Sequence, residues 1–239
     1  METVQKNDFV EIEFNGIANN QIFDTTNKEE AKKIGLDADV KPLIISIGND
    51  MIIKGFDEYL PGKEIQKKYT LVLSQEKAFG KRNPSMIKTM PIKVFLEKDM
   101  YPSPGMTIQL DNYIAKILSV SGGRVIVDFN NPLAGKEVTY EFEIKRKVED
   151  IKEKINALQE FFFREKYDFE IKDKKVLLKN KKPDPKEPLG EKKLNFLIEI
   201  YKKKFHEIID FDFEIDETAE KKKAEKIEEK TDKIEEKQQ

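Results

Sequence analysis

Alternating apolar and polar positions predict two β-strands at the start of the chain. Between Val4 and Phe14 apolar side chains alternate with charged ones, which is the period of a strand in an antiparallel sheet. Asn15-Gly16 is a common turn sequence. Ile22-Phe23 then resume a strand, which ends at Asp24-Thr25-Thr26. We therefore expect a turn at Asn15-Gly16 between two paired strands.

The stretch from Pro42 to Gly62 changes its period half-way along. Residues 43–47 are rich in β-branched side chains and predict a strand. Ile52, Phe56 and Tyr59 or Leu60 then recur at helical spacing, with Asn49 or Asp50 as the expected N-cap and Pro61-Gly62 as the end. A helix of about two turns is marginal alone, so it must pack on a sheet. Its apolar side chains Ile52, Ile53 and Phe56 are either ordinary core or the floor of an apolar pocket.

Strand patterns continue through the middle of the chain. Residues 65–73 predict a strand, and residues 77–84 predict a loop. Within 86–133 two strands flank the hairpin turn Asp111-Asn112, and a third covers 124–129, which predicts a small all-β unit. Pro91, Pro102 and Pro104 are expected to make its first segment irregular. A strand over 137–146 then carries Val138, Tyr140, Phe142 and Ile144 on one face.

The remaining segments alternate between helix and strand patterns. Residues 27–40 predict a surface insertion that is helical over 28–34. Helices are expected near 148–165 and 194–205, with a hairpin over 169–178 and a strand over 208–215. This aromatic-rich α/β unit either packs on itself or provides a surface for a second copy or another protein. The Pro/Lys-rich 181–190 predicts a loop, and 217–239 predicts a solvated tail, either a frayed helix or disordered.

Composition narrows the classes of function. Of the 239 residues 38% are charged, yet the net charge is only -2, which argues against nucleic-acid binding through bulk charge. The chain has no cysteine, which excludes disulfides and thiolate metal sites and favours a cytoplasmic location. No apolar run has the length of a membrane span, and we expect no membrane partner. His206 is the single histidine and is expected to be a surface or helix-end side chain rather than a catalytic one.

Several motifs together resemble one enzyme family. Their order is Phe23-Asp24-Thr25-Thr26, Ile47-Gly48, Ile52 to Asp57, Pro61 to Glu64, and Ala78-Phe79-Gly80. They resemble the FKBP family of peptidyl-prolyl cis-trans isomerases. Asn131 to Lys136 followed by Tyr140 to Ile144 is similar to its SlyD-like branch, in which a small domain is inserted in the flap above the active site. The resemblance covers residues 4–147, and only weakly the C-terminal unit.

The resemblance implies an α+β fold in several parts. An FKBP-like antiparallel sheet wrapped on a short helix is expected from residues 1–85 and 134–147. An all-β flap domain is expected over 86–133, a C-terminal α/β domain over 148–216 and a charged tail over 217–239.

The resemblance also implies a site. Its catalytic residues would be Asp24, Ile53, Phe56, Phe79 and Tyr140. Its substrate-binding residues would be Phe14, Phe23, Leu43 or Ile45, and Ile52. Phe56 would lie under the proline ring, the backbone N–H of Ile53 would hold a carbonyl, and Asp24 would orient the pocket or polarise the amide. Asp24 could instead be a plain turn carboxylate, and Tyr140 a plain core aromatic. Phe14 and Phe79 stand where the family usually has tyrosine, and Phe56 where single-domain members have tryptophan.

The function that the resemblance implies is prolyl isomerisation with chaperone activity towards unfolded or nascent polypeptides. The reaction needs no nucleophile, and we expect no cofactor and no metal. Ile114, Leu118 and Val127 of the insert would bind unfolded chains. The alternative is a non-enzymatic holdase or assembly module that works as a homodimer through the C-terminal unit.

Overall fold

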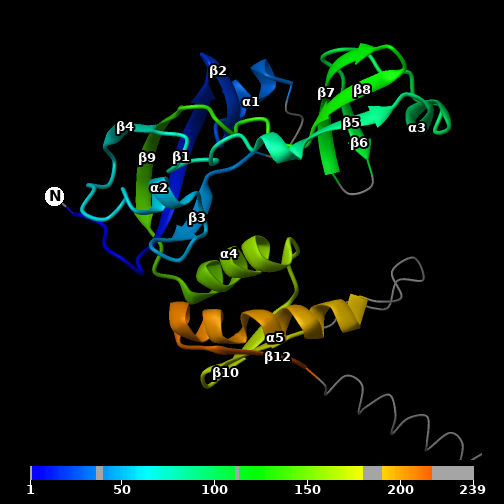
Figure 1. Ribbon diagram of the computed structural model, residues 1–239. Helices are drawn as coiled ribbons and strands as arrows, with labels where there is room; N and C mark the ends of the chain where they lie inside the picture. The colour runs from blue at the N-terminus through cyan, green and yellow to red at the C-terminus, as the bar shows by residue number, and fades with distance from the viewer. Residues whose placement is uncertain (1, 36–39, 111–112, 180–189, 217–239) are drawn as a thin grey trace, which may run out of the picture. The chain divides into compact units, whose positions relative to one another are not determined.

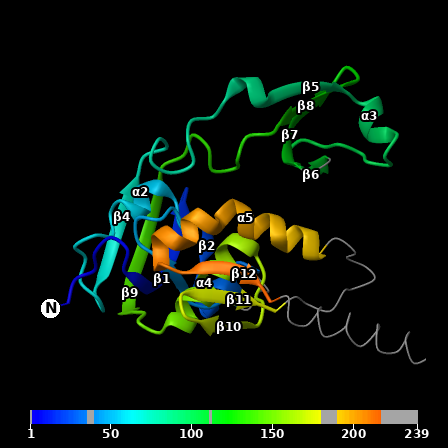
Figure 2. The same cartoon turned by 90° about the horizontal axis from the view of Figure 1, so that it is seen from below.

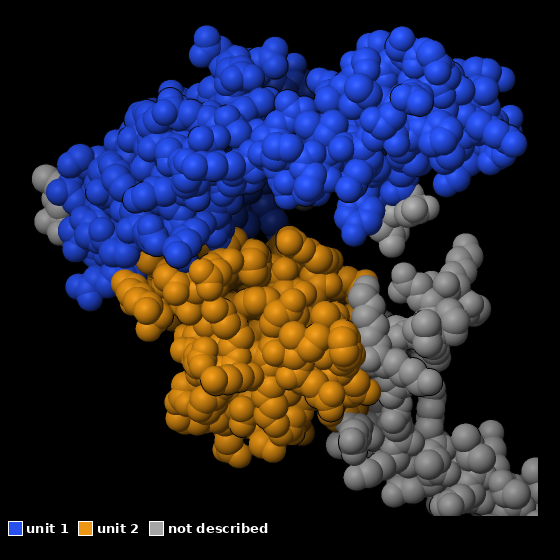
Figure 3. Space-filling view, in the orientation of Figure 1, with its two compact units in different colours: residues 1–5, 11–43, 52–146 blue, residues 6–10, 44–51, 147–239 orange. Residues whose placement is uncertain are grey.

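The computed structural model describes residues 2–35, 40–110, 113–179 and 190–216 (Figure 1). The chain divides into two compact units (Figure 3). The first contains residues 1–5, 11–43 and 52–146, and the second contains residues 6–10, 44–51 and 147–239. Two short segments from the first fifty residues therefore group with the C-terminal part of the chain.

The described helices and strands follow the predicted order. The strands are β1 (Phe9–Ala18), β2 (Gln21–Thr25), β3 (Leu43–Ser46), β4 (Lys68–Leu73), β5 (Ile87–Pro91), β6 (Thr107–Leu110), β7 (Tyr113–Ser121), β8 (Arg124–Asp128), β9 (Val138–Lys147), β10 (Phe169–Lys172), β11 (Lys175–Leu178) and β12 (Asp212–Ile215). The helices are α1 (Lys28–Lys33), α2 (Lys54–Asp57), α3 (Lys93–Leu96), α4 (Ile151–Phe163) and α5 (Gly190–Ile209), with a 3-10 turn at Pro84–Met86. The mixture of helices and antiparallel sheets confirms the α+β class.

The central sheet has the order β2-β1-β9-β4, and β3 pairs with β1. On β9 the side chains of Val138, Tyr140, Phe142 and Ile144 are all buried, as the alternation predicted. The strand β9 pairs antiparallel with β4, so that Tyr140 lies opposite Leu71. The sheet therefore presents one continuous apolar face, on which α2 packs.

The prediction of a turn at Asn15-Gly16 was wrong. Both residues lie inside β1, and the turn to β2 occurs at Asn19 and Asn20, whose φ angles are 50° and 60°. A Cβ atom on Gly16 would lie 2.7 Å from Cζ of Phe23, so glycine is needed there to admit an aromatic ring. The pairing shifts register by a bulge between Gly16 and Ile17. The glycine signal was real, but its cause was close packing rather than chain reversal.

The helix in the central stretch is shorter than predicted. α2 is a single turn that begins after Ile53, and neither Asn49 nor Asp50 caps it. Asn49 instead donates from its Nδ2 to Ser46 Oγ at 2.8 Å and to Asn7 Oδ1 at 3.2 Å. Asp50 has a φ angle of 58° and therefore reverses the chain. These polar residues build the turn between β3 and α2 rather than a helix terminus.

The inserted segment is a four-stranded sheet with the order β5-β8-β7-β6. Strands β6 and β7 pair antiparallel as predicted, and the expected turn residues 111–112 lie outside the described residues. The first segment forms β5, which ends at Pro91, and then α3, whereas Pro102 and Pro104 lie in the irregular stretch between α3 and β6, as expected. Phe95 of α3 is fully buried in the insert's apolar core with Ile117 and Val125. The insert is therefore mainly β, with one short helix that closes its core.

The neck is the pair of chain segments that enter and leave the insert, residues 80–86 and 128–135. The buried side chain of Asn130 bridges them, since its Oδ1 accepts from the Asn83 N–H at 2.8 Å and its Nδ2 donates to the Asn83 carbonyl at 3.0 Å. Arg82 forms an ion pair with Asp128 at 2.5 Å. Burial opposes the charge of Asp128, but hydrogen bonds from Asn130 and the nearby Arg82 outweigh it and lower the pKa of this carboxyl. Polar bonds therefore fasten the two neck segments to each other.

The second unit contains a three-stranded sheet of order β10-β11-β12 with the helices α4 and α5 (Figures 1 and 2). The hairpin β10–β11 confirms the prediction, and β12 pairs in parallel with β11. α5 extends to Ile209, so the strand expected from Ile208 begins only at Asp212. The Val148 N–H donates to the Phe9 carbonyl at 2.7 Å, and Lys204 pairs with Asp50 at 3.3 Å. These bonds explain why residues 6–10 and 44–51 belong to this unit.

Two predicted features lie outside the described residues. They are most of the loop expected over 181–190 and the charged tail over 217–239. Within the described ranges, every helix is too short or too polar to cross a membrane.

The packing of Gly16 against Phe23 predicts that the cost of Gly16→Ala in stability depends on the presence of the Phe23 ring. We expect Gly16→Ala to lower the free energy of unfolding by about 1–3 kcal/mol, because the new Cβ atom overlaps the Phe23 ring. In a Phe23→Ala background the same substitution should cost almost nothing. Urea unfolding of the four proteins measures the coupling, and an equal cost in both backgrounds would contradict the packing explanation.

Candidate functional site

Five aromatic side chains form a connected cluster on the apolar face of the central sheet. Phe56 of α2 lies at its base, with its ring centroid 4.8 Å from that of Tyr140 and 6.2 Å from that of Phe14. Tyr140 also contacts Phe23 at 5.9 Å, and Phe23 contacts Phe79 at 5.8 Å. Phe56 and Tyr140 are buried, whereas Phe14, Phe23 and Phe79 are half-buried. We name these five residues the aromatic cluster.

The position of Phe56 depends on the glycine before it. The Gly55 N–H donates to the Lys77 carbonyl at 3.1 Å. A Cβ atom on Gly55 would lie 2.6 Å from that same carbonyl oxygen. The single turn of α2 is therefore held against the loop after β4, which is the loop that carries Phe79. This contact brings the base and one edge of the aromatic cluster together from segments that are 20 or more residues apart.

Two buried threonines position the other edge. Thr26 bonds the backbone of Phe14 twice: its Oγ1 accepts from the Phe14 N–H at 2.7 Å, and its own N–H donates to the Phe14 carbonyl at 3.0 Å. Thr25 donates from its Oγ1 to Asn15 Oδ1 at 2.5 Å. These bonds fix the end of β2 against β1. They therefore set where Phe23 and Asp24 stand relative to Phe14.

The aliphatic residues that were expected to bind substrate differ in burial. Ile52 and Ile53 are half-buried, as is Leu43, whereas Ile45 is fully buried in β3. The Ile53 carbonyl accepts from the N–H groups of Phe56 and Asp57. The Ile53 N–H donates to none of the described residues. A backbone donor beside the aromatic cluster is therefore open to an external acceptor.

Asp24 supplies the charge beside the aromatic cluster. It follows Phe23 on β2 and lies opposite Gly16 of β1. Its side chain reaches solvent, but the surrounding protein removes part of its hydration. This burial raises the pKa of Asp24 above its ordinary value, against a smaller opposing effect of a hydrogen bond from the Thr25 backbone. The charge of Asp24 also raises the pKa of Tyr140, after the larger effect of burial. The negative charge of Asp24 therefore disfavours ionisation of the Tyr140 hydroxyl.

The candidate client-binding residues of the insert are not all exposed. Ile114 is 65% exposed and Leu118 is 37% exposed, so both are open to a partner. Val127 is fully buried in the insert's core, so its assignment to a binding surface was wrong. The alternation on β8 placed Val127 on an apolar face, but this face is the inner one, because α3 covers it with Phe95. Tyr113, which the motif analysis did not select, is 63% exposed.

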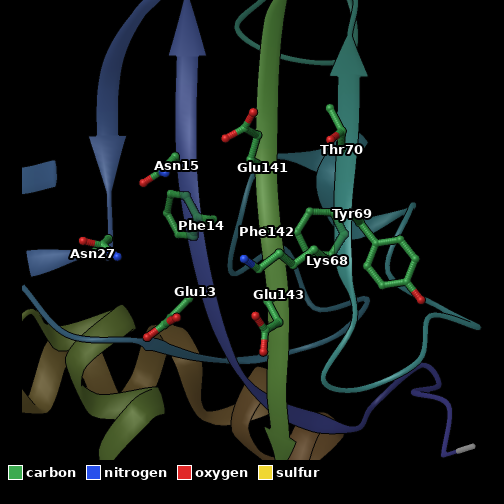
Figure 4. Close-up of a pocket in the computed structure, with 10 residues that line it drawn as sticks. All are labelled: Glu13, Phe14, Asn15, Asn27, Lys68, Tyr69, Thr70, Glu141, Phe142 and Glu143. Carbon is green, nitrogen blue, oxygen red and sulfur yellow. The ribbon is translucent and has the colours of Figure 1, made fainter. Parts of the chain in front are cut away.

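A separate hollow of about 410 Å³ lies on the strands β1, β9 and β4 (Figure 4). Its lining is mainly polar and consists of Glu13, Phe14, Asn15, Asn27, Lys68, Tyr69, Thr70, Glu141, Phe142 and Glu143. Lys145 pairs with Glu13 at 3.0 Å and with Glu143 at 3.1 Å, and these bonds raise its pKa. Only Phe14 is shared with the aromatic cluster. A charged hollow of this kind favours water and ions over an apolar ring.

The geometry gives no support to catalysis by His206 or to a metal site among the described residues. His206 lies exposed in the last turn of α5, 3.6 Å from Asp210 and 3.6 Å from Asp212. This position confirms the prediction of a helix-end side chain. Within the part of the chain that the structure describes, no group of three or more histidine, aspartate or glutamate residues is arranged to hold a metal ion.

Comparison with known proteins identifies the family. The family model described as FKBP-type peptidyl-prolyl cis-trans isomerase matches residues 1–95, and the one described as FKBP26, IF domain, matches residues 88–133. A short-type peptidyl-prolyl cis-trans isomerase of Methanocaldococcus jannaschii is 30% identical over 145 residues, which cover 59% of this chain and 92% of that protein. The chain belongs to the FKBP-type peptidyl-prolyl cis-trans isomerases.

Two bacterial relatives extend the same conclusion. The FKBP-type 16 kDa peptidyl-prolyl cis-trans isomerase of Escherichia coli K12 is 26% identical over 60% of this chain and 93% of its own length. The FKBP-type isomerase SlyD of Vibrio cholerae is 31% identical over 43% of this chain and 53% of its own length. The family therefore confirms the resemblance inferred from the motifs and identifies this FKBP-type protein as an isomerase enzyme.

Proposed function

We propose that this FKBP-type isomerase accelerates rotation about prolyl peptide bonds in the aromatic cluster. The observation that carries the proposal is the arrangement of five rings around Phe56, with the Asp24 carboxylate and the unpartnered Ile53 N–H beside them. A proline ring is apolar and fits among aromatic side chains. The backbone donor and the carboxylate can then orient the peptide on either side of it.

The chemistry follows from the nature of the barrier. Rotation about the C–N bond of an amide is opposed by about 18–20 kcal/mol because conjugation is lost in the twisted state. The planar amide carries more charge separation than the twisted amide, so water stabilises the planar form more. An apolar cluster that excludes water removes this preference and binds the twisted state relatively better. The proposed reaction therefore needs neither a nucleophile nor a metal nor a cofactor.

This proposal predicts the effect of two substitutions on prolyl exchange. Asp24→Asn and Phe56→Leu should each lower kcat/KM by at least about tenfold, because one loses the charge and the other the aromatic base. The control Glu58→Gln changes an exposed carboxylate just after α2 and should be neutral. Exchange spectroscopy of a short Xaa-Pro peptide gives the rates, and thermal unfolding checks the fold of each variant. An inactive wild-type protein would overturn the proposal.

The raised pKa of Asp24 adds a pH dependence to the same experiment. Burial favours the protonated carboxyl, so the charge is lost at a higher pH than for an ordinary aspartate. Turnover should be full above this pKa and should fall as the pH drops through it. In Asp24→Asn this acid limb should be absent.

We further propose that the insert binds unfolded polypeptides and delivers their prolyl bonds to the aromatic cluster. Ile114 and Leu118 form an exposed apolar strip on one face of β7. Exposed apolar side chains on one strand suit extended, unfolded chains. The neck joins the insert covalently to the rest of the chain, and the Asn130 bonds hold its two segments to each other, so a bound chain stays at a raised local concentration.

The insert proposal predicts that peptide and protein substrates respond differently. The double variant Ile114→Ser, Leu118→Ser should leave tetrapeptide turnover within about twofold but slow catalysed refolding of a protein on the order of tenfold. Val72→Ser is the matched control, because Val72 is 54% exposed on β4, outside the insert. Equal losses in both assays would contradict the proposal that the insert binds only protein substrates.

The cytoplasmic location expected from the cysteine-free sequence stays a prediction.

An exposed apolar patch on the C-terminal unit supports a second candidate property, which is self-association. Phe196 is 62% exposed and Ile200 is 52% exposed, and they lie one turn apart on α5. Among the described residues of the second unit they are the only exposed large apolar side chains. A second copy presents the same patch, so a two-fold interface would cover both. We propose a homodimer through α5, in addition to the enzymatic role.

The dimer proposal predicts a change of mass in solution. Phe196→Ser, Ile200→Ser should convert a dimer into a monomer, because both patches lose their apolar contact. Lys202→Ser, an exposed residue on another face of the same helix, should leave the dimer intact. Light scattering after size-exclusion chromatography measures the mass. A wild-type protein that stays monomeric at every concentration would disprove the interface.

A further inference from the structure

The Tyr140 hydroxyl is the unusual polar group of the aromatic cluster. The Tyr140 ring lies within 6 Å of three others, since the centroids of Phe56, Phe14 and Phe23 are 4.8, 5.7 and 5.9 Å away. The residue as a whole is only 4% exposed. The other four members of the cluster are phenylalanines and carry no polar atom on their side chains. Tyr140 therefore holds the one side-chain hydrogen-bond donor among these rings.

This hydroxyl has no hydrogen-bond partner among the described residues. Within the same ranges, the one side-chain polar atom that is both buried and without a partner is Nε2 of Gln159. The Tyr140 hydroxyl must therefore reach solvent, although its ring is enclosed. A buried tyrosine usually satisfies its hydroxyl with a protein group. Here the ring is anchored in the apolar face, while the hydroxyl has no partner among the described residues.

The protonation state of Tyr140 suits donation. Burial and the negative charge of Asp24 raise the pKa of Tyr140 far above the ordinary value for tyrosine, so the hydroxyl keeps its proton. A phenol of this kind can donate to a carbonyl oxygen throughout the pH range in which proteins are folded. Ile53 offers the second free donor of the region through its backbone N–H.

We infer that the Tyr140 hydroxyl binds a backbone carbonyl of the prolyl substrate and so positions the peptide over Phe56. The inference rests on the isomerase function proposed above. The carbonyl in question is not that of the rotating bond. A donor on that oxygen would stabilise the charge-separated planar amide and would slow rotation. The partial charge on the carbonyl oxygen of a neighbouring peptide bond does not change during the rotation. A hydrogen bond from Tyr140 to that oxygen therefore stabilises the ground state and the transition state equally.

Uniform binding of this kind has a defined kinetic signature. Tyr140→Phe removes the hydroxyl and keeps the ring, so the packing against Phe56 persists. We expect KM for a proline-containing tetrapeptide to rise roughly three- to tenfold, with kcat unchanged within about twofold. Thermal unfolding of the variant should match that of the wild type.

Tyr69→Phe is the matched control. Tyr69 lies on β4 of the same sheet, its ring stacks on Phe142 at 5.4 Å, and its hydroxyl accepts from the Glu64 N–H at 2.8 Å. Its removal should lower stability and leave KM unchanged. A second readout uses tyrosine labelled with carbon-13 at Cζ, since the Tyr140 signal should shift on addition of the peptide while the Tyr69 signal should not.

The outcomes separate this inference from the function on which it rests. A wild-type protein without turnover would overturn the proposed function itself. An active wild type whose Tyr140→Phe variant has the same KM and an unshifted Cζ signal would overturn the inference alone. A fall in kcat at constant KM would also overturn it, because the hydroxyl would then act on the rotating bond.

Discussion

The packing of Phe56 onto β9 is the contact on which the isomerase part of the molecule depends. A helix of one turn has almost no stability of its own, so α2 exists because its aromatic side chain is buried against Tyr140 and Phe142. Burying a phenylalanine contributes about 1.5–3 kcal/mol. Gly55 allows the close approach that this contact needs. The same contact that stabilises the fold therefore also makes the base of the site.

Hydrogen bonds fix segments that apolar packing alone does not hold, namely the end of β2 and the two segments of the neck. Thr26 joins the end of β2 to Phe14, and Asn130 joins the two segments of the neck. Each bond is buried or partly buried, where hydrogen bonds are specific in direction and costly to leave unmade. A few directional contacts thus order one edge of the aromatic cluster and hold the two neck segments to each other. The insert has its own apolar core around Phe95.

Because the surface is rich in charged side chains, the exposed apolar side chains indicate where a partner could bind. Many lysines and glutamates form exposed ion pairs, which add little stability individually. Against this background, the strip on β7 and the patch on α5 are exposed apolar regions on separate units. We propose an unfolded client for the strip and a second copy for the patch. The central sheet keeps its polar hollow charged through Lys145 and its two glutamates, which separates it chemically from the aromatic cluster.

The sequence by itself determined the class of fold and the family. Strand and helix periods are local, so they located β9, the hairpin β10–β11 and α4. The order of the motifs also selected all five members of the aromatic cluster. Tertiary structure alone decided why Gly16 is glycine, because the Phe23 ring that requires the space comes from the next strand. It also decided that Val127 faces inward, because α3 covers that side of the insert's sheet. The free hydroxyl of Tyr140 likewise depends on which distant groups fail to reach it. A pattern along the chain reports which side chains share a face, but only packing decides what each face meets.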